Sequence, residues 1–207
     1  MWNWSEDQMT LVLIRHGATE ANKQHRYLGI TDEALSEEGK RSLVTNKELQ
    51  CYPPLDMLFV SPMKRCTQTA RLLYPELQPF PIAEWTEMDF GAFEGKNYLE
   101  LCEDERYQAW IDSNGTLPFP DGESREDFIL RCGKGFERMW EEVLQAKKNS
   151  KTNVIGVIVH GGTIMALLSK FYGGDYFDYQ VPNATGYICT VKDQNGTPEF
   201  ITIKKLF

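Results

Sequence analysis

The chain has 207 residues, 42% of them apolar and 25% charged, which is typical of a globular protein with one full hydrophobic core. Its formal net charge of −8 argues against a general nucleic-acid surface, which needs a basic stripe, and against electrostatic docking to anionic membranes. The first residues, MWNWSEDQM, lack the pattern of a signal peptide, and the apolar runs are too short to cross a bilayer. Five scattered cysteines indicate reduced thiols and a cytoplasmic location.

Apolar runs of strand length alternate with helical patterns along the chain. We expect strands at residues 10–14, 56–60, 154–159, 186–191 and 200–204, the last two joined by a turn at Asn195-Gly196. We expect helices at residues 35–49, 61–74, 97–112, 124–148 and 163–172. Ser36 and Ser124 are N-cap candidates, Asp127 completes a possible capping box with Ser124, and Pro62 stands in the first turn of the second helix.

This alternation predicts an α/β protein with three layers, α/β/α, around a mostly parallel central sheet. The strands are continuous apolar runs, as expected when helices cover both faces of the sheet. We find no repeat, low-complexity tract or linker, so we expect a single domain over residues 1–207. Residues 1–8 are expected to be a poorly ordered extension. Residues 84–123 are irregular, with a helical and loop character that predicts an inserted lid or cap.

Three of the expected strands end in residues that suit an anion site. The first ends at Arg15-His16-Gly17, the second has Arg65 one turn into the following helix, and the third ends at His160-Gly161-Gly162. In parallel α/β sheets, the carboxyl ends of the strands meet at one edge, where ligands bind. Glycine there lets a ligand approach closely, and the helix that follows offers free N–H groups. The sequence therefore predicts a pocket with two arginines and two imidazoles.

Such a pocket suits a tetrahedral dianion, above all a phosphoryl group. Arginine offers planar paired donors to phosphate oxygens, and a neutral imidazole is able to attack phosphorus. The second imidazole, if protonated, would add a charge and a donor. Taken singly, His16 or His160 is equally well explained as a core histidine, and Arg65 is better explained as a solvated helix residue. The joint pattern favours a phosphoryl-transfer site that needs neither a metal ion nor a cofactor.

Five motifs occur in one order between Leu11 and about Gly186. They are R-H-G at Arg15-His16-Gly17, S-P-x-x-R-x-x-x-T-A from Ser61 to Ala70, E-x-x-F/Y-G-x-x-E-G from Glu87 to Gly95, G-E-S at Gly122-Glu123-Ser124, and H-G-G at His160-Gly161-Gly162. In this set and order the chain resembles the histidine phosphatase superfamily, in its phosphoglycerate-mutase-like branch. The resemblance implies the three-layer α/β fold and a phosphohistidine mechanism.

The resemblance also implies roles for individual residues. His16 would be the nucleophile, and Arg15, Arg65 and His160 would bind the phosphoryl group. Glu87 would protonate the leaving oxygen and then act as the base for the attacking water. The resemblance and the strand ends together also suggest four substrate-binding residues, which are Asn22, Leu28, Gly29 and Gly161.

Some assignments have competitors in the sequence. Glu84 lies close enough to Glu87 to be confused with it, and only the motif favours Glu87. Mutases of this family carry a pair of arginines in an insertion after the acidic residue, whereas residues 88–122 contain only Lys96 and Arg106 as basic residues. This difference favours a phosphatase.

The sequence thus predicts a phosphoric monoester hydrolase that acts on a small-metabolite phosphate monoester. The segment EMDFGAFEG resembles α-ribazole-5′-phosphate phosphatases, and broad-specificity phosphatases share similar segments. Rings in residues 84–123 could stack on a flat substrate, although packing within the lid and core explains most of them better. Two alternatives stay open, a phosphoglycerate-mutase-type phosphoryl transferase and a non-catalytic module that binds a phospho-ligand. A zinc hydrolase is disfavoured by the spacing of histidines and cysteines.

Overall fold

The computed structural model describes residues 8–148, 150 and 152–207, so that the expected N-terminal extension lies almost wholly outside the described residues. Within them, six strands form one sheet in the order β3-β2-β4-β1-β5-β6. The strands are β1 (Met9–Arg15), β2 (Met57–Val60), β3 (Phe80–Pro81), β4 (Val154–Val159), β5 (Gly186–Gln194) and β6 (Thr197–Lys205). The pairs β1–β4, β2–β4 and β2–β3 are parallel, whereas β5 runs antiparallel to both β1 and β6.

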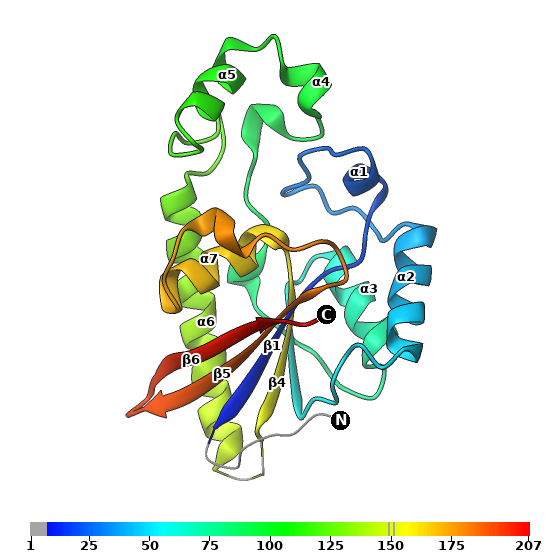
Figure 1. Ribbon diagram of the computed structural model, residues 1–207, viewed down its shortest axis with the longest axis vertical. Coiled ribbons are helices and arrows are strands. Elements are labelled where there is room, and N and C mark those ends of the chain that lie inside the picture. The colour runs from blue at the N-terminus through cyan, green and yellow to red at the C-terminus, as the bar shows by residue number, and fades with distance from the viewer. Residues whose placement is uncertain (1–7, 149, 151) are drawn as a thin grey trace.

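Helices cover both faces of this sheet (Figure 1). The α-helices are α1 (Glu20–Lys23), α2 (Glu37–Glu48), α3 (Lys64–Leu73), α4 (Tyr98–Leu101), α5 (Glu105–Asp112), α6 (Arg125–Lys147) and α7 (Gly161–Phe171), with short 3₁₀ helices η1 (Ala83–Trp85), η2 (Gly91–Phe93) and η3 (Tyr176–Tyr179). Helices α2 and α3 pack on one face, and α6 and α7 pack on the other. The expected three-layer α/β fold with a mostly parallel sheet is confirmed.

Strand β1 shows how the sequence builds the two layers. Its side chains alternate, so that Leu11 and Leu13 join the core under α6 and α7, whereas Val12 and Ile14 join the core under α2 and α3. All four are essentially inaccessible to solvent. A strand buried on both faces has no polar side, which explains why the sequence shows a continuous apolar run instead of alternation.

Several expected boundaries move in the structure. The second helix begins at Lys64 instead of Ser61, because Met63 is an extended N-cap and the Lys64 N–H donates to Asp32 at 2.7 Å. The helix expected at residues 97–112 is two helices, since Asp104 caps the N-terminus of α5 and starts a new helix there. The Ser124 cap is present, since its Oγ accepts from the Asp127 N–H at 3.0 Å. The Asp127 carboxylate accepts from that hydroxyl at 2.7 Å instead of from the Ser124 N–H, so the capping box is incomplete. The turn at Asn195-Gly196 is confirmed, with both residues at positive φ.

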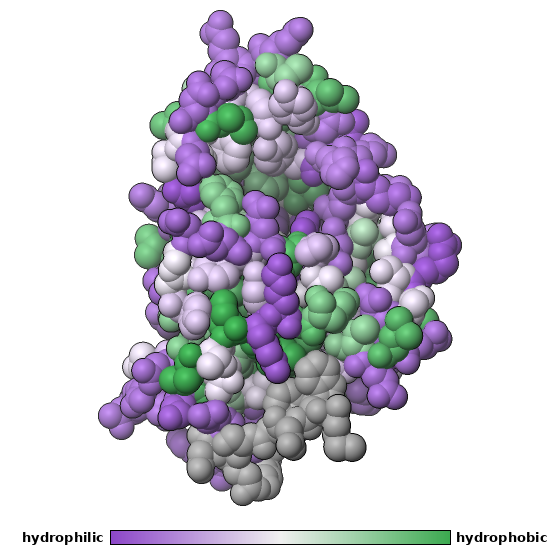
Figure 2. Space-filling view, viewed as in Figure 1, coloured by the Kyte–Doolittle hydropathy of each residue, from purple (hydrophilic) through white to green (hydrophobic). Residues whose placement is uncertain are grey.

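The segment expected to be a lid stands at one end of the molecule. Figure 1 shows α4 and α5 beyond the carboxyl ends of the central strands, apart from the layers that sandwich the sheet. Figure 2 shows apolar side chains recessed between this end and the body, in a surface that is otherwise mostly polar. The segment thus lies over the strand ends, and its role as a lid or cap stays a prediction. No helix of the described part is long and apolar enough to cross a membrane.

Candidate active site

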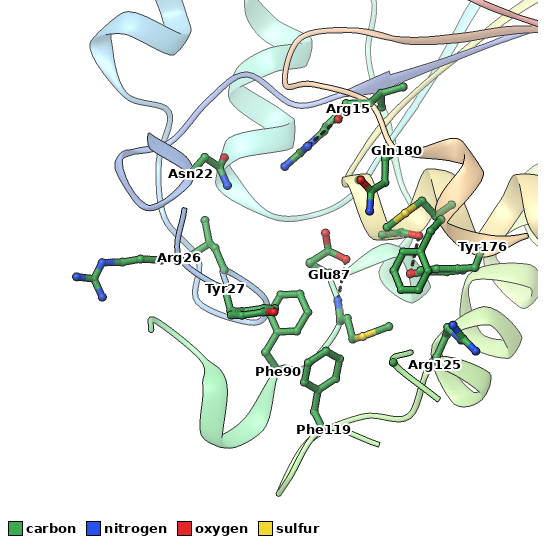
Figure 3. Close-up of a pocket in the computed structure, with 18 of the residues that line it drawn as sticks. Arg15, Asn22, Arg26, Tyr27, Glu87, Phe90, Phe119, Arg125, Tyr176 and Gln180 are labelled. Carbon is green, nitrogen blue, oxygen red and sulfur yellow. Dashed lines mark hydrogen bonds between the residues drawn. The ribbon is translucent and has the colours of Figure 1, made fainter. Parts of the chain in front are cut away.

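A cavity of about 640 Å³ opens at the carboxyl ends of β1 and β4, beneath α4 and α5. We call one part of its wall the polar end, which consists of Arg15, His16, Asn22, Glu87, Gly161 and Gly162. We call another part the aromatic end, which consists of Tyr27, Phe90, Trp110, Phe119, Tyr176 and Phe177. Figure 3 shows the Glu87 carboxylate on the side that faces Arg15. Tyr27, Phe90 and Phe119 lie on the other side of Glu87 from Arg15.

His16 follows β1 directly and is held in one tautomer. Its Nδ1 lies 2.7 Å from the carbonyl oxygen of Gly17, which is able only to accept, so Nδ1 carries the proton and Nε2 the lone pair. Burial lowers the pKa of His16 well below its usual value, and the charges of Arg65 and Arg15 lower it further. The imidazole is therefore neutral near pH 7. A neutral ring with a fixed lone pair at Nε2 is the form that a nucleophile needs.

Arg15 has a donor with no protein partner. Its Nη1 donates to the carbonyl of Val181 at 2.7 Å, whereas Nε is buried and makes no hydrogen bond within the described residues. Gly161 lies against this guanidinium, and a Cβ at that position would stand 3.2 Å from Nε. Burial lowers the pKa of Arg15, and the carboxylate of Glu87 opposes that shift. An anionic oxygen at this place would satisfy the unused N–H, because buried donors without acceptors are costly.

Arg65 and His160 lie behind His16 instead of lining the cavity. Both are fully buried, and the His160 ring centroid is 5.2 Å from that of His16. Arg65 donates from Nε to His160 Nδ1 at 3.2 Å and from its two Nη atoms to the carbonyls of Thr31 and Gly29, each at 2.8 Å. His160 Nδ1 is thus an acceptor, and its Nε2 donates to Ser61 Oγ at 2.8 Å. Burial lowers the pKa of His160 well below its usual value, so the ring is neutral and adds no charge.

Glu87 has the properties of a proton donor. It is 8% exposed, and its Oε1 accepts a hydrogen bond from the Met88 N–H at 2.9 Å. Burial raises its pKa, while that N–H and the charges of Arg65 and Arg15 oppose the rise. Gly162 packs directly on the carboxylate, since a Cβ there would stand 2.5 Å from Oε1. Glu84, the competitor in the sequence, faces Arg138 at 3.7 Å and does not line the cavity.

The expected substrate-binding positions divide into two groups. Asn22 and Leu28 line the cavity with Gly161. The Asn22 side-chain oxygen accepts from the Thr19 N–H and from Asn183 Nδ2, each at 3.2 Å, which leaves its Nδ2 as the donor toward the cavity.

Gly29 was expected among the substrate-binding residues, but in this structure it does not line the cavity and its N–H is already used. It donates to the carboxylate of Glu94 at 2.9 and 3.1 Å, and the Thr31 N–H donates to the same carboxylate at 3.0 Å. The carbonyls of Gly29 and Thr31 point the other way and accept from Arg65. Loop 29–31 therefore links Glu94 to Arg65, and its contribution to the site is to position that arginine.

Sequence reasoning missed Arg131, an arginine that positions the loop of the acid Glu87. Arg131 on α6 donates to the carbonyls of Glu84 and Thr86, at 2.7 and 2.9 Å, and to both carboxylate oxygens of Glu123, at 2.9 and 2.7 Å. These bonds fix the loop that ends in Glu87. The sequence does contain a signal for this ion pair, because an acidic and a basic residue stand only eight residues apart, with the start of α6 between them.

Sequence reasoning also missed Asn183, whose N-x-S/T triplet looks like a chance match. Its Nδ2 donates to the His16 carbonyl at 3.1 Å as well as to Asn22. No local pattern marks this role, because the partners are more than 160 residues away in the chain.

Metal ligation has no visible basis in the part of the chain that the structure describes. No group of three or more His, Cys, Asp and Glu side chains is placed to hold a metal ion there. The charges that face an anion in the cavity come from arginine.

Comparisons with known proteins agree with this geometry. The family model of the histidine phosphatase superfamily (branch 1) matches residues 11–204. A 2,3-bisphosphoglycerate-dependent phosphoglycerate mutase 2 of Gloeobacter violaceus is 31% identical over 77% of this chain and 74% of its own. An adenosylcobalamin/alpha-ribazole phosphatase of Salmonella typhimurium is 32% identical over 63% of this chain and 67% of its own.

A solved structure of a putative alpha-ribazole-5′-P phosphatase from Escherichia coli has the same fold, with a TM-score of 0.77 over 95% of this chain and 96% of that one, at 23% identity. The neighbours thus include both phosphatases and mutases. The chain belongs to branch 1 of the histidine phosphatase superfamily and is an enzyme of that family, a phosphatase or mutase.

Proposed function

We propose that the protein is a metal-independent phosphatase that hydrolyses a small-metabolite phosphate monoester through a phosphohistidine at His16. One observation carries the proposal. His16 presents a neutral ring with its lone pair at Nε2, and beside it the buried Nε–H of Arg15 finds no acceptor among the residues that the structure describes. A phosphoryl group between them would meet a nucleophile on phosphorus and a donor on an equatorial oxygen.

The proposed reaction has two steps. His16 Nε2 attacks phosphorus, the P–O bond to the leaving group breaks, and Glu87 gives its proton to the leaving oxygen. Glu87, now ionised, takes a proton from water as the water oxygen attacks phosphorus and the P–N bond breaks. Inorganic phosphate leaves, and His16 is again neutral. The raised pKa of Glu87 supports its role as acid in the first step.

The remaining groups orient the phosphoryl group in this proposal. Arg15, Gly161 and Asn22 contact it from the cavity wall, and Leu28 closes the wall beside them. Arg65 supplies positive charge from behind His16 and has two N–H groups beyond the three that hold Thr31, Gly29 and His160. His160 holds Arg65 and packs edge-on against His16.

The lid favours hydrolysis over a mutase reaction. Arg106 is exposed and donates to Asp104 at 2.9 Å, Lys96 is exposed, and neither lines the cavity. The segment contributes rings to the wall instead, which suit a leaving group with a flat part. The Salmonella relative makes α-ribazole-5′-phosphate the first candidate substrate. The five cysteines are free, which supports the proposed cytoplasmic location.

Phosphate release from a panel of esters, with EDTA present, tests the proposal. The panel contains an aryl phosphate, sugar phosphates, 3-phosphoglycerate and α-ribazole-5′-phosphate, with wild type and His16→Ala side by side. Release by wild type alone is the expected result, and the ranking of kcat/KM identifies the substrate class. Loss of activity in EDTA would contradict metal independence. Conversion of 3-phosphoglycerate to its isomer without release of phosphate would identify a mutase instead.

A further inference from the structure

The cavity is much larger than a phosphoryl group requires. Its volume of about 640 Å³ lies in the range of pockets that enclose a whole small-molecule ligand. The polar end accounts for the phosphoryl group, so the aromatic end is available to the leaving group. The part of the cavity wall farthest from the polar end, which we call the far wall, therefore bears on which leaving group fits.

Arg125, the first residue of α6, lies in that far wall. Figure 3 shows it on the other side of Glu87 from Arg15, beside Tyr176 and near Phe119. Its guanidinium stacks over the Tyr176 and Phe177 rings, 5.6 and 5.7 Å from their centroids. Because Glu87 lies between the two arginines, a leaving group that departs past the acid would extend toward Arg125.

Contacts between neighbouring residues connect Arg125 to the polar end. Gly162 packs on the Glu87 carboxylate, and the Tyr176 hydroxyl donates to the Gly162 carbonyl at 3.3 Å. Tyr176 in turn carries the stacked Arg125. Burial raises the pKa of the Tyr176 hydroxyl well above its usual value, Glu87 adds to the rise and Arg125 opposes it, so both charges lie near this ring.

Arg125 has no carboxylate partner in the described part of the chain. Of the described residues, none forms a salt bridge with it, and its one hydrogen bond is a long one of 3.4 Å from Nη1 to the Asn114 carbonyl. The other lining arginine away from the polar end, Arg26, is neutralised by Glu100 at 2.6 Å. A cation in the first turn of a helix is also unfavourable, since the helix dipole presents its positive end there. The helix dipole and the missing ion pair thus disfavour an arginine at this position, and recognition of an anion would explain its presence.

We propose that Arg125 and the rings that flank it form a subsite for an acidic group on the leaving group of the substrate. The inference rests on the proposed phosphatase function and deepens it. The preferred ester has a flat or apolar body, which the aromatic end accommodates, and ends in a carboxylate that pairs with the guanidinium. Esters of this kind then outrank α-ribazole-5′-phosphate, whose base and sugar carry no acid.

Two synthetic esters of equal shape test the subsite. These are para-carboxyphenyl phosphate and para-carbamoylphenyl phosphate, which differ in the charge of the remote group. The measured quantity is the ratio of their kcat/KM values, compared between wild type and variants, so that the intrinsic reactivity of each ester cancels. Arg125→Gln removes the charge, and Arg125→Lys keeps it without the planar fork. Arg138→Gln is the matched control, since Arg138 is an exposed arginine of the same helix outside the cavity.

We expect the ratio in wild type to exceed that in Arg125→Gln by about tenfold or more, the value of a charge-assisted hydrogen bond. Arg125→Lys should fall between the two, and Arg138→Gln should equal wild type. The neutral ester should lose less kcat/KM than the acidic ester in both Arg125 variants, because its carbamoyl oxygen accepts a hydrogen bond but carries no charge. An unchanged ratio in both Arg125 variants would overturn the subsite while leaving the phosphatase intact. Failure of wild type to hydrolyse either ester would overturn the phosphatase and the subsite together.

Discussion

The two ends of the cavity are built by different parts of the fold. Most of the polar end follows the parallel strands β1 and β4, with Asn22 added from α1 and Glu87 from the loop after η1. Its arginine and histidine, and the pair Arg65 and His160 behind them, are held by bonds of 2.7–3.2 Å. The aromatic end comes from the segment with α4 and α5, from η3 and from Tyr27 in the loop after α1, and its rings meet mainly edge to face. Fixed geometry at the first end suits a reaction common to many esters. Ring contacts at the second end suit selection among esters.

This comparison predicts two classes of variant. Changes at the polar end should lower kcat for every ester, whereas changes at the aromatic end should alter KM and should depend on the leaving group. The following predictions test that division, from the largest expected effect to the smallest.

His16→Ala should lower kcat by about 10⁴-fold or more for aryl and alkyl esters alike, because it removes the nucleophile. The fold should persist, since the lost side chain lies at the cavity and makes its one bond to the adjacent Gly17 carbonyl. Phosphate release and a thermal melt measure the two effects. Turnover by a folded His16→Ala protein would exclude the covalent mechanism. Wild type briefly mixed with labelled ester should also yield a phosphorylated protein that is stable in base and labile in acid.

Glu87→Gln should lower kcat by about 10²- to 10⁴-fold for alkyl esters and much less for aryl esters, whose leaving groups need little help from an acid. An equal loss on both ester types would contradict the acid role. The comparison is made with para-nitrophenyl phosphate and glycerol phosphate.

The same two residues set the expected pH profile. The pKa of Glu87 is raised, so its proton is present at low pH and is lost as pH rises through that value. The pKa of His16 is lowered well below 6.5, so its neutral form persists as pH falls below the usual histidine range and is lost only at lower pH. Alkyl-ester kcat/KM should therefore fall on the alkaline side with the ionisation of Glu87, and Glu87→Gln should remove that limb. A rise in activity with pH through the usual histidine range would contradict this assignment.

Glu94→Ala should lower kcat/KM by about tenfold for all esters and weaken inhibition by inorganic phosphate, because loop 29–31 would no longer hold Arg65 in place. Glu94→Gln retains one acceptor oxygen and should lose less. Asp56→Asn is the control. Asp56 also accepts two backbone N–H bonds, each at 2.8 Å, but it does so at the opposite end of the sheet. That variant should lower the melting temperature without changing phosphate inhibition, and equal kinetic losses in the two variants would show that Glu94 acts only through stability.

Trp110→Leu should raise KM about two- to tenfold for aryl esters, the value of one aromatic contact, and leave kcat unchanged. Glycerol phosphate should be unaffected, because it has no ring to stack. Steady-state kinetics with the two esters measure the difference. A fall in kcat for both would place Trp110 with the polar end and would remove the distinction between the two ends.

Sequence reasoning could place most residues of the polar end near one another because their signals are local. The apolar run before Arg15 and the run before His160 specify strands, and parallel strands necessarily bring their carboxyl ends together. The same reasoning treated residues 97–112 as one helix, since it did not weigh the cap that Asp104 supplies to a second helix. For a related reason the sequence did not reveal that the Gly29 N–H is already used, because its acceptor, Glu94, lies far away in the chain.

By itself the sequence determined the layers, the strand ends and the residues most directly suited to phosphoryl transfer, because hydrophobic pattern and short motifs fix these over a few residues. Only the tertiary structure decided that Arg65 and His160 stand behind His16, that Asn183 orients Asn22, and that Arg125 faces the cavity beside Tyr176. Each of these depends on contacts between segments distant in sequence, whose relative position is set by packing and leaves no local pattern.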